Sequence, residues 1–404
     1  MKTKKMSYAT QAPSSFHKRA KIKIGQILGT RPSLYNNQLL ISSGIPSLDN
    51  VIGGGLAVGT VLLIEEDKYG SYARIMLKYF VAEGVMTDQS IFLSSANEVP
   101  QHLVKELPAP LDDTGHTTVN SSQSPSTQQS PQKDASAAET TSDEKLKIAW
   151  RYQSKPKVQS APTSNIRFGH YYDLTKSMND EKIKAADISF EHYLLDVNPL
   201  SIPSIPCMNL KYHQLLQHIK SRIERGMFST TQQVEKRRIL RIGIHSLGSP
   251  LWGESGGKRS DKDGFDPSLS LFLIGLRGIL RSAFAVAMIT LPTTLFHDKA
   301  FIKRVERMCD TVIKLESFAG SPNEKNPLFK EYHGFLHVVQ LPHLNSLIPA
   351  QPTTTDLAFK LRRKKFTIEK FHLPPELADN VSEDKTNSGS KSGCGASENS
   401  KLSF

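Results

Sequence analysis

Residues 41–84 read ISSGIPSLDNVIGGGLAVGTVLLIEEDKYGSYARIMLKYFVAEG, and this stretch decides the fold of the chain. A glycine run precedes a β-branched apolar segment at 61–64, which predicts a strand. A polar loop at 66–72 then leads into a helical apolar pattern. Strand, loop and helix in this order form the arrangement in which a P-loop holds phosphates on the N–H groups of a helix N-terminus. The loop is therefore the first candidate for a nucleotide site.

The loop lacks the residues that nucleotide hydrolysis needs. A working P-loop combines flexible glycines with a lysine near the β- and γ-phosphates and a Ser or Thr hydroxyl for Mg²⁺. Here the only glycine is Gly70, and Ala73 and Arg74 stand where Lys-Thr is expected. Asp67 would add negative charge where a phosphate would sit. Lys68 could neutralise a phosphate, but it precedes the glycine and is better explained as a surface residue.

Two further parts of an ATPase are missing. The predicted strand 239–244 ends in His245, and a neutral imidazole is a poorer magnesium ligand than a carboxylate. The predicted strand 91–94 is followed by Ser-Ala-Asn, without the carboxylates of a catalytic glutamate. We therefore expect no catalytic residue, no metal and no cofactor bound by this chain alone. The loop and the strand end together form a degenerate nucleotide pocket of Asp67, Lys68, Tyr69, Gly70, Ala73, Arg74 and His245.

The positive charge of the chain is concentrated in two segments. The net charge is +12; residues 1–24 carry seven Lys and Arg without an acid, and residues 360–370 carry six against one glutamate. Such basic segments are typical of a nucleic-acid partner, although basic tails often only solubilise a protein. The chain has no run of 18 apolar residues, which predicts no membrane span, and its three cysteines have no metal-site or disulfide spacing. An intracellular, reduced protein is expected.

The chain as a whole predicts one α/β domain. Residues 25–377 alternate strand and helix patterns, which indicates a mainly parallel central sheet flanked by helices, and the helix-poor end suggests an antiparallel extension. Residues 1–24 and 378–404 have the composition of disordered tails, and residues 108–145 that of a disordered insertion. Strands are predicted at 90–94, 147–152, 168–173, 239–244, 284–291, 311–315, 335–340 and 365–373. Helices are predicted at 212–225, 269–281 and 298–309.

Longer strings of residues resemble a known family. The pattern SGIPSLD-x3-GGGL-x2-GTV resembles the opening of a RecA/KaiC-type ATPase domain, and RIGIHSL resembles its metal-binding strand with histidine in place of aspartate. The strings GTRPS, GGGLAVGTVLLIEEDKY, KIAWRYQ, RFGHYYD, LGSPLWG and DLAFKLRRKKFTIEKFHLPPEL resemble the family that supplies the fourth subunit of the Elongator complex. This resemblance covers about residues 25–377, without the insertion and the tails.

The resemblance implies a RecA-like fold and a role in assembly. In that family, two related RecA-like subunits join this one in a heterohexameric ring with two copies of each. The ring docks on the Elongator catalytic subcomplex, which adds 5-carboxymethyl-type groups to the wobble uridine of tRNA, and it binds tRNA in response to ATP. The implied partners are those subunits and tRNA, with ATP at ring interfaces, and the implied location is the cytoplasm and nucleus, without a membrane.

Within such a ring, two basic sites are candidates for RNA contact. They are the loop residues Lys258, Arg259 and Lys262 and the run Arg362, Arg363, Lys364 and Lys365. Phosphate contacts of this kind are electrostatic and depend on salt. The alternative is that these charges are only solvated at a protein–protein interface. Tyr69, Tyr72 or Trp252 could stack on bases, although aromatic residues at such positions are more often core or interface residues.

Two other functions stay open on the sequence. One is an active ATPase with an unusual loop, in which Lys68 or Arg74 replaces the missing lysine. The other is a RecA-like paralogue that acts on DNA or in transcription elongation. The leading interpretation is a non-catalytic assembly and tRNA-binding subunit.

Overall fold

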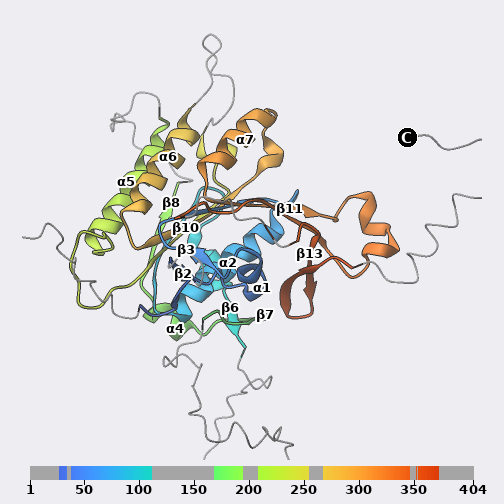
Figure 1. Cartoon of the computed structure of the whole chain (residues 1–404), viewed down its shortest axis with the longest axis horizontal. Coiled ribbons are helices and arrows are strands. Elements are labelled where there is room, and N and C mark those ends of the chain that lie inside the picture. The colour runs from blue at the N-terminus through green and yellow to red at the C-terminus, as the bar shows by residue number, and fades with distance from the viewer. Residues whose placement is uncertain are drawn as a thin grey trace, which may run out of the picture.

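The computed structural model describes the parts of the chain that form the predicted domain (Figure 1). The described residues are 27–33, 38–111, 168–193, 208–253, 267–345, 352 and 354–372. The two predicted tails, the strand at 147–152 and the loop candidates Lys258, Arg259 and Lys262 lie outside them. None of the described helices is both long and apolar enough to cross a membrane.

A nine-stranded sheet forms the centre of the molecule, in the order β14-β13-β12-β11-β4-β10-β9-β5-β8. Six neighbouring strands pair in parallel: β11 (Thr311–Ser317), β4 (Val61–Glu65), β10 (Ala285–Leu291), β9 (Leu240–His245), β5 (Ser90–Ser95) and β8 (Ile188–His192). The antiparallel end consists of β12 (Gly334–Gln340), β13 (Leu357–Arg362) and β14 (Lys365–Lys370). The predicted parallel sheet with an antiparallel C-terminal extension is confirmed.

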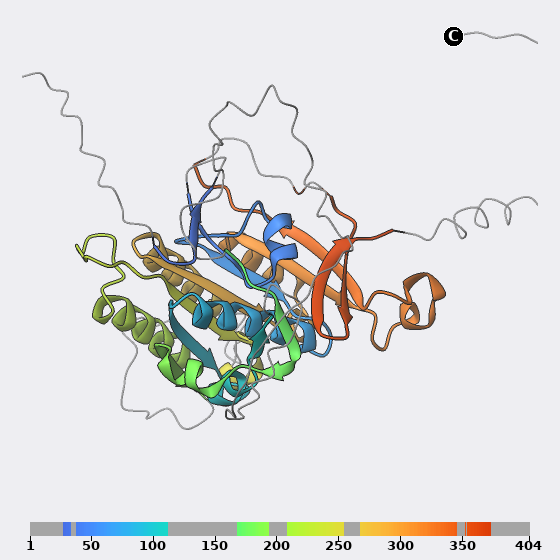
Figure 2. The ribbon, with the colours of Figure 1, turned by 90° about the horizontal axis from the view of Figure 1, so that it is seen from below.

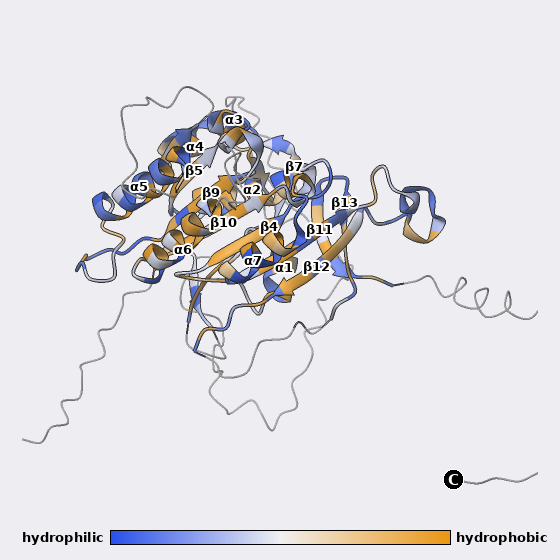
Figure 3. Cartoon of the chain, turned by 90° about the horizontal axis from the view of Figure 1, so that it is seen from above, coloured by the Kyte–Doolittle hydropathy of each residue, from blue (hydrophilic) through white to orange (hydrophobic). Residues whose placement is uncertain are grey.

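Helices cover both faces of this sheet (Figures 1 and 2). One face carries α1 (Pro46–Val51), α2 (Ser71–Met86) and α3 (Pro100–Lys105), and the other carries α5 (Leu210–Arg225), α6 (Ser268–Arg281) and α7 (Lys299–Met308). Alternate residues of β4 enter the two cores: Leu62 and Ile64 pack with α2, whereas Val61 and Leu63 pack with the α5–α7 side. Strands buried on both faces are therefore mostly apolar, as Figure 3 shows for β4 and β10, whereas β9 also carries the buried Arg241.

Local signals explain where the long helices begin and end. The side chain of Asn209 accepts a hydrogen bond from the Lys211 N–H and starts α5, and Gly226 ends it. Buried residues at a spacing of four, Leu215, Ile219 and Ile223, turn one face of α5 to the core. The predicted boundaries of α5, α6 and α7 are correct to within two residues.

Two small sheets complete the domain. One contains β1 (Thr30–Pro32), β2 (Leu39–Ile41) and β3 (Leu56–Ala57), and the other pairs β6 (Pro108–Pro110) with β7 (Tyr172–Ser177). The prediction that the insertion begins at residue 108 is therefore wrong, because 108–110 form a strand; residues 112–145 lie outside the described residues. Prolines are tolerated there because β6 is an edge strand. The predicted strand 168–173 is shifted to β7.

Short elements were missed by the sequence patterns. Among them are α1, β8, β13 and the helix α4 (Asp180–Ala185), as well as the short strands β1, β2, β3 and β6. α4 has no buried residue and so no apolar stripe, and β13 carries charged residues within an otherwise apolar strand. Between β11 and β12, the 3-10 turns Pro322–Lys325 and Pro327–Phe329 project from the end of the sheet (Figure 2).

Candidate functional site

The loop between β4 and α2 is closed by its own aspartate. Asp67 is buried, and its carboxylate accepts hydrogen bonds from the N–H groups of Ser71 (3.3 Å), Tyr72 (3.0 Å) and Ala73 (3.4 Å). These donors belong to the first turn of α2, which has no intrahelical partners for them. They are the groups that hold phosphate in a P-loop. An internal carboxylate occupies this position here.

Glu66, the residue before Asp67, carries a second buried carboxylate. Glu66 accepts hydrogen bonds from the hydroxyls of Ser246 and Thr290, both at 2.7 Å. Burial raises the pKa of Glu66, against the effect of these two hydrogen bonds. Gly70 precedes the helix with φ of +67°, and a Cβ atom there would lie 3.2 Å from a Glu66 oxygen. The loop thus surrounds the helix N-terminus with acidic groups.

Lys68 does not face the N-terminus of α2 as a P-loop lysine would. Lys68 and Tyr69 are exposed, and the Lys68 Nζ lies 5.3 Å from the centre of the Tyr69 ring. A Cβ built on Gly320, in the loop after β11, would lie 2.7 Å from the Tyr69 hydroxyl and 3.6 Å from the Lys68 Nζ. Both side chains therefore reach toward that neighbouring loop.

Arg74 and His245 meet at a carboxylate that the sequence patterns did not identify. Arg74 donates two hydrogen bonds of 2.9 Å to Glu98, and its third nitrogen lies 2.9 Å from Glu106. The His245 Nδ1 lies 3.4 Å from Glu98 and 3.3 Å from the Ser95 hydroxyl. The prediction of no catalytic carboxylates after the strand 91–94 did not consider Glu98, which comes directly after Ser-Ala-Asn and turns back to the end of β5.

A local turn explains the position of Glu98. The Ser95 hydroxyl accepts hydrogen bonds from the N–H groups of Asn97 (3.1 Å) and Glu98 (3.2 Å), which reverses the chain after β5. Burial lowers the pKa of His245, so that its ring is neutral at neutral pH. Burial would raise the pKa of Glu98, but the hydrogen bonds and charge of Arg74 lower it. The Glu98 carboxylate is therefore held by two hydrogen bonds from Arg74.

The degenerate pocket is thus a set of satisfied internal contacts. The structure brings Asp67, Gly70 and Ala73 together at the helix start and Arg74 with His245 around Glu98, and it places Lys68 and Tyr69 outside. Within the described residues, no group of three or more His, Cys, Asp or Glu side chains could hold a metal ion. Cys309 is a buried thiol whose pKa is raised by burial.

The basic run lies at the turn of the β13–β14 hairpin. Arg362 pairs with Lys365 across the hairpin, and Arg363 and Lys364 form the turn. Arg362 forms an ion pair with Glu331, and Lys364 forms one of 3.3 Å with Asp173. Arg363 and Lys365 are exposed and form no ion pair with any other described residue. They are the two cations of the run that remain available for phosphate.

Arg363 sits in a strained backbone conformation. Its φ is +46°, in the left-handed region, which costs a residue other than glycine about 1–2 kcal/mol. A glycine would fit this turn without that cost. An exposed arginine at such a position is a reason to assign it a function.

Of the three aromatic residues considered for base stacking, one is excluded. Trp252 is fully buried and stacks on Tyr212 with ring centres 6.1 Å apart. Tyr72 is half-buried against Phe359. Tyr69 alone is largely exposed, at 60%.

Comparison with known proteins gives consistent matches along the chain. The model of the family described as PAXNEB protein matches residues 23–404. Elongator complex protein 4 of Danio rerio is 47% identical over 374 residues, covering 91% of this chain and 90% of that protein. The protein of the same name from Homo sapiens is 46% identical, covering 89% of this chain and 82% of that protein. A KaiC-like protein from Pyrococcus horikoshii OT3 has a TM-score of 0.43 at 12% identity, covering 82% of this chain and 98% of that chain.

Proposed function

The chain belongs to the PAXNEB family, with Elongator complex protein 4 as its relatives, and on this basis we propose that it is a non-catalytic subunit of the Elongator accessory ring. The ring is a heterohexamer with two copies each of this chain and of two related RecA-like subunits. It docks on the Elongator catalytic subcomplex in the cytoplasm and nucleus. It supports tRNA binding and the 5-carboxymethyl-type modification of the wobble uridine, and any ATP it uses binds at interfaces between subunits.

The position of Asp67 carries the non-catalytic part of this proposal. Its carboxylate accepts the hydrogen bonds of the α2 N-terminus that a phosphate would accept, and Glu66 lies beside it. A nucleotide would have to displace an internal anion and approach a second one. Removing Asp67 from those N–H groups would leave the helix uncapped. The loop therefore serves as a scaffold between β4 and α2.

The hairpin turn supports the tRNA part. Arg363 and Lys365 are exposed cations without internal ion pairs among the described residues, on the part of the chain with a local excess of positive charge. Cations of this kind bind the phosphate backbone with little sequence preference. tRNA contact at this turn would thus add affinity without reading the sequence.

We expect the double substitution R363Q/K365Q to weaken tRNA binding by the reconstituted ring about 30-fold at 0.1 M salt. Each of the two substitutions removes one phosphate contact. Each lost contact makes the slope of log affinity against log salt less steep by about 0.7–0.9. The measurement is tRNA affinity across a salt series. The matched control is K299Q/R307Q, which removes two exposed cations from α7 on the other face of the sheet. Equal affinities and slopes for the two double variants, with the ring intact, would contradict tRNA contact at the turn.

A second substitution separates binding from folding. Arg363→Gly removes the charge and also relieves the left-handed strain, so the protein should become more stable by about 1 kcal/mol while tRNA binding falls. A variant that is more stable and binds less tRNA cannot owe its defect to unfolding.

Competition with duplex DNA in the same assay tests the DNA-binding alternative, which a preference for duplex DNA over tRNA would favour.

The ATPase alternative has its own test. Lys68→Ala should leave ATP turnover by the ring unchanged, because this lysine is exposed and reaches toward the Gly320 loop, away from the N-terminus of α2. The measurement is phosphate release by wild-type and variant rings of equal assembly. Loss of turnover in the K68A ring would favour an active site on this chain.

A further inference from the structure

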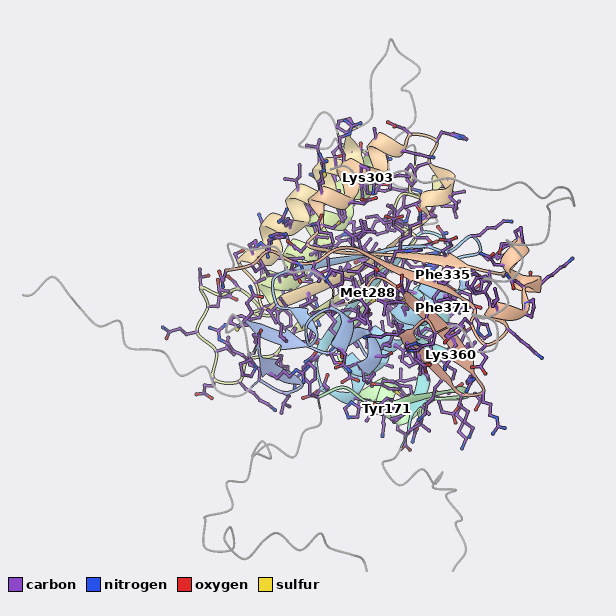
Figure 4. All side chains as sticks on the ribbon, turned by 45° about the vertical axis from the view of Figure 1, so that its right-hand side comes forward. Tyr171, Met288, Lys303, Phe335, Lys360 and Phe371 are labelled. Atoms are coloured by element: carbon purple, nitrogen blue, oxygen red, sulfur yellow. The ribbon has the colours of Figure 1, made fainter. Side chains whose placement is uncertain are left out.

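A surface cavity of about 210 Å³ lies beside the basic hairpin. It is formed by the start of α1, the residues that lead into β7, and strand β14. Its lining includes Ser47 and Asn50 from α1, His170 and Tyr171 before β7, and Lys365 and Thr367 from β14. Figure 4 shows Tyr171 at the margin of the molecule, near the hairpin. The degenerate pocket does not include this cavity, and of the two cations proposed above to contact phosphate only Lys365 lines it.

Tyr171 gives the cavity an aromatic wall. It is 45% exposed, and the Nζ of Lys365 lies 5.1 Å from the centre of its ring. An exposed aromatic ring next to an exposed lysine offers a stacking surface for a base and a cation for its phosphate. Asn50, also exposed, carries an amide that can both donate to and accept from the edge of a base.

The residues on both sides of Tyr171 are held by hydrogen bonds to α2. The Tyr172 hydroxyl donates a hydrogen bond of 2.7 Å to the buried Glu83, and the N–H of His170 donates one of 3.1 Å to the same carboxylate. The ring of His170 contacts Glu83 as well, at 3.1 Å. Tyr171 therefore stands on an ordered segment, so that less conformational freedom is lost when a ligand stacks on it.

The hairpin turn is fixed to the same segment. The Leu174 N–H donates a hydrogen bond of 2.9 Å to the carbonyl oxygen of Lys364, and the Lys364 amine forms an ion pair with Asp173. The distance between the exposed ring and the exposed cations is thus set by β7 and β14 together. A nucleotide whose base is unstacked can place that base on the flat aromatic surface and its phosphate near the cations. In a paired duplex the base faces are covered by neighbouring bases and cannot make this contact.

We propose that this cavity binds one unpaired nucleotide of an RNA, with the base stacked on Tyr171 and the phosphate near Lys365. This inference rests on the proposed tRNA binding and adds a preference to it. The hairpin cations alone would hold any phosphate backbone. The cavity selects RNA with an unpaired base, as in a loop or at an end.

The test uses the full-length chain in the reconstituted ring with the variants Tyr171→Ala and Tyr171→Phe. Y171A should weaken binding of tRNA about 5- to 160-fold, the range for loss of one stacked base, and Y171F should bind as the wild type does. The slope of log affinity against log salt should not change, because no charge is removed. Binding of a blunt RNA duplex should not change either. The matched control is Leu295→Ala, which removes a large exposed apolar side chain (54% exposed) outside the cavity.

The outcomes separate this inference from the function on which it rests. If R363Q/K365Q weakens tRNA binding and Y171A does not, the stacking site is wrong and tRNA contact at the hairpin stands. If neither weakens it, both are wrong. An equal loss of duplex and tRNA binding in Y171A would also overturn the stacking site. Failure of the Y171A ring to assemble would show that Tyr171 is a protein–protein contact instead.

Discussion

Replacing Glu83 with glutamine should lower the stability of the protein by about 3 kcal/mol, the scale for removing one partner from a buried charge cluster. Glu83 lies on α2 and is fully buried. Its carboxylate accepts hydrogen bonds from Tyr172 and His170, which join α2 to the start of β7. Glutamine keeps the size of the side chain, so the loss measures the charge.

Arg241 is the reason why that charge matters. It is fully buried on β9 and donates hydrogen bonds to Gln89 (2.6 Å) and to the carbonyl oxygens of Ser42 (2.9 Å) and Phe80 (3.2 Å). Burial lowers the pKa of Arg241 to about 10, and Glu83 is the strongest opposing influence, so the guanidinium stays charged at neutral pH. Without Glu83 this cation is buried without its main counter-charge.

The pH dependence follows from the pKa of Glu83. Burial alone would raise this pKa, but the hydrogen bond and charge of His170, the charge of Arg241 and the Tyr172 hydroxyl lower it below 4.5. The carboxylate therefore stabilises the fold fully above pH 4.5, and this contribution is lost as the pH falls through the lower folded pKa. The stability difference between wild type and E83Q should thus shrink in acid.

Urea unfolding of both proteins at several pH values measures this difference. Glu224→Gln is the matched control, because Glu224 is 62% exposed and lies 4.0 Å from Lys220, and exposed pairs contribute little. A stability loss in E83Q no larger than in E224Q would show that the buried cluster does not need the charge. The E83Q variant should also bind tRNA less well if Tyr171 depends on this support.

The sheet could be predicted from the sequence because its strands carry their own signal. β4 is apolar from Val61 to Ile64 and β10 is apolar except for Thr290, which is typical of parallel strands buried on both faces. α1 could not be predicted in this way, because Pro46 indicates a turn and yet occupies the first turn of a helix. β13 was missed because Lys360 is buried in it, where its amine pairs with Glu369 of the neighbouring strand. That partner is set by the hairpin and not by the local pattern.

The site was predicted only in part, for a similar reason. The absence of P-loop residues is visible in the sequence, since it concerns residue types at fixed spacing. The position of the Asp67 carboxylate and the return of Glu98 to His245 depend on hydrogen bonds made after folding. Tyr171 could not be singled out within RFGHYYD, because exposure of a single aromatic residue leaves no pattern in the sequence. Contacts between distant elements are what the sequence could not supply.

Replacing Gly44 with alanine should destabilise the protein by about 3 kcal/mol, from a left-handed backbone at about 1–2 kcal/mol and overpacking at about 1–3 kcal/mol. Gly44 belongs to the SGIPSLD pattern and has φ of +87°. A Cβ atom there would lie 2.3 Å from the Tyr79 carbonyl oxygen and 2.6 Å from its carbon. These are backbone atoms inside α2, so they cannot move aside as a side chain could.

Two other glycines separate the conformational contribution to the stability loss from the overpacking contribution. Gly53 has φ of +90° and no atom within 4 Å of a built Cβ, so Gly53→Ala should cost only the conformational part, about 1–2 kcal/mol. Gly278 lies in α6 with the same free space and no positive φ, so Gly278→Ala should stabilise the helix by about 0.5–1 kcal/mol. Unfolding midpoints of the three variants should therefore fall in the order G278A, G53A, G44A. A G44A protein as stable as G53A would mean that α1 and α2 are not held in close contact at Tyr79. The position of α2, which carries Glu83 and begins at the N–H groups bound by Asp67, would then be less fixed than these buried contacts indicate.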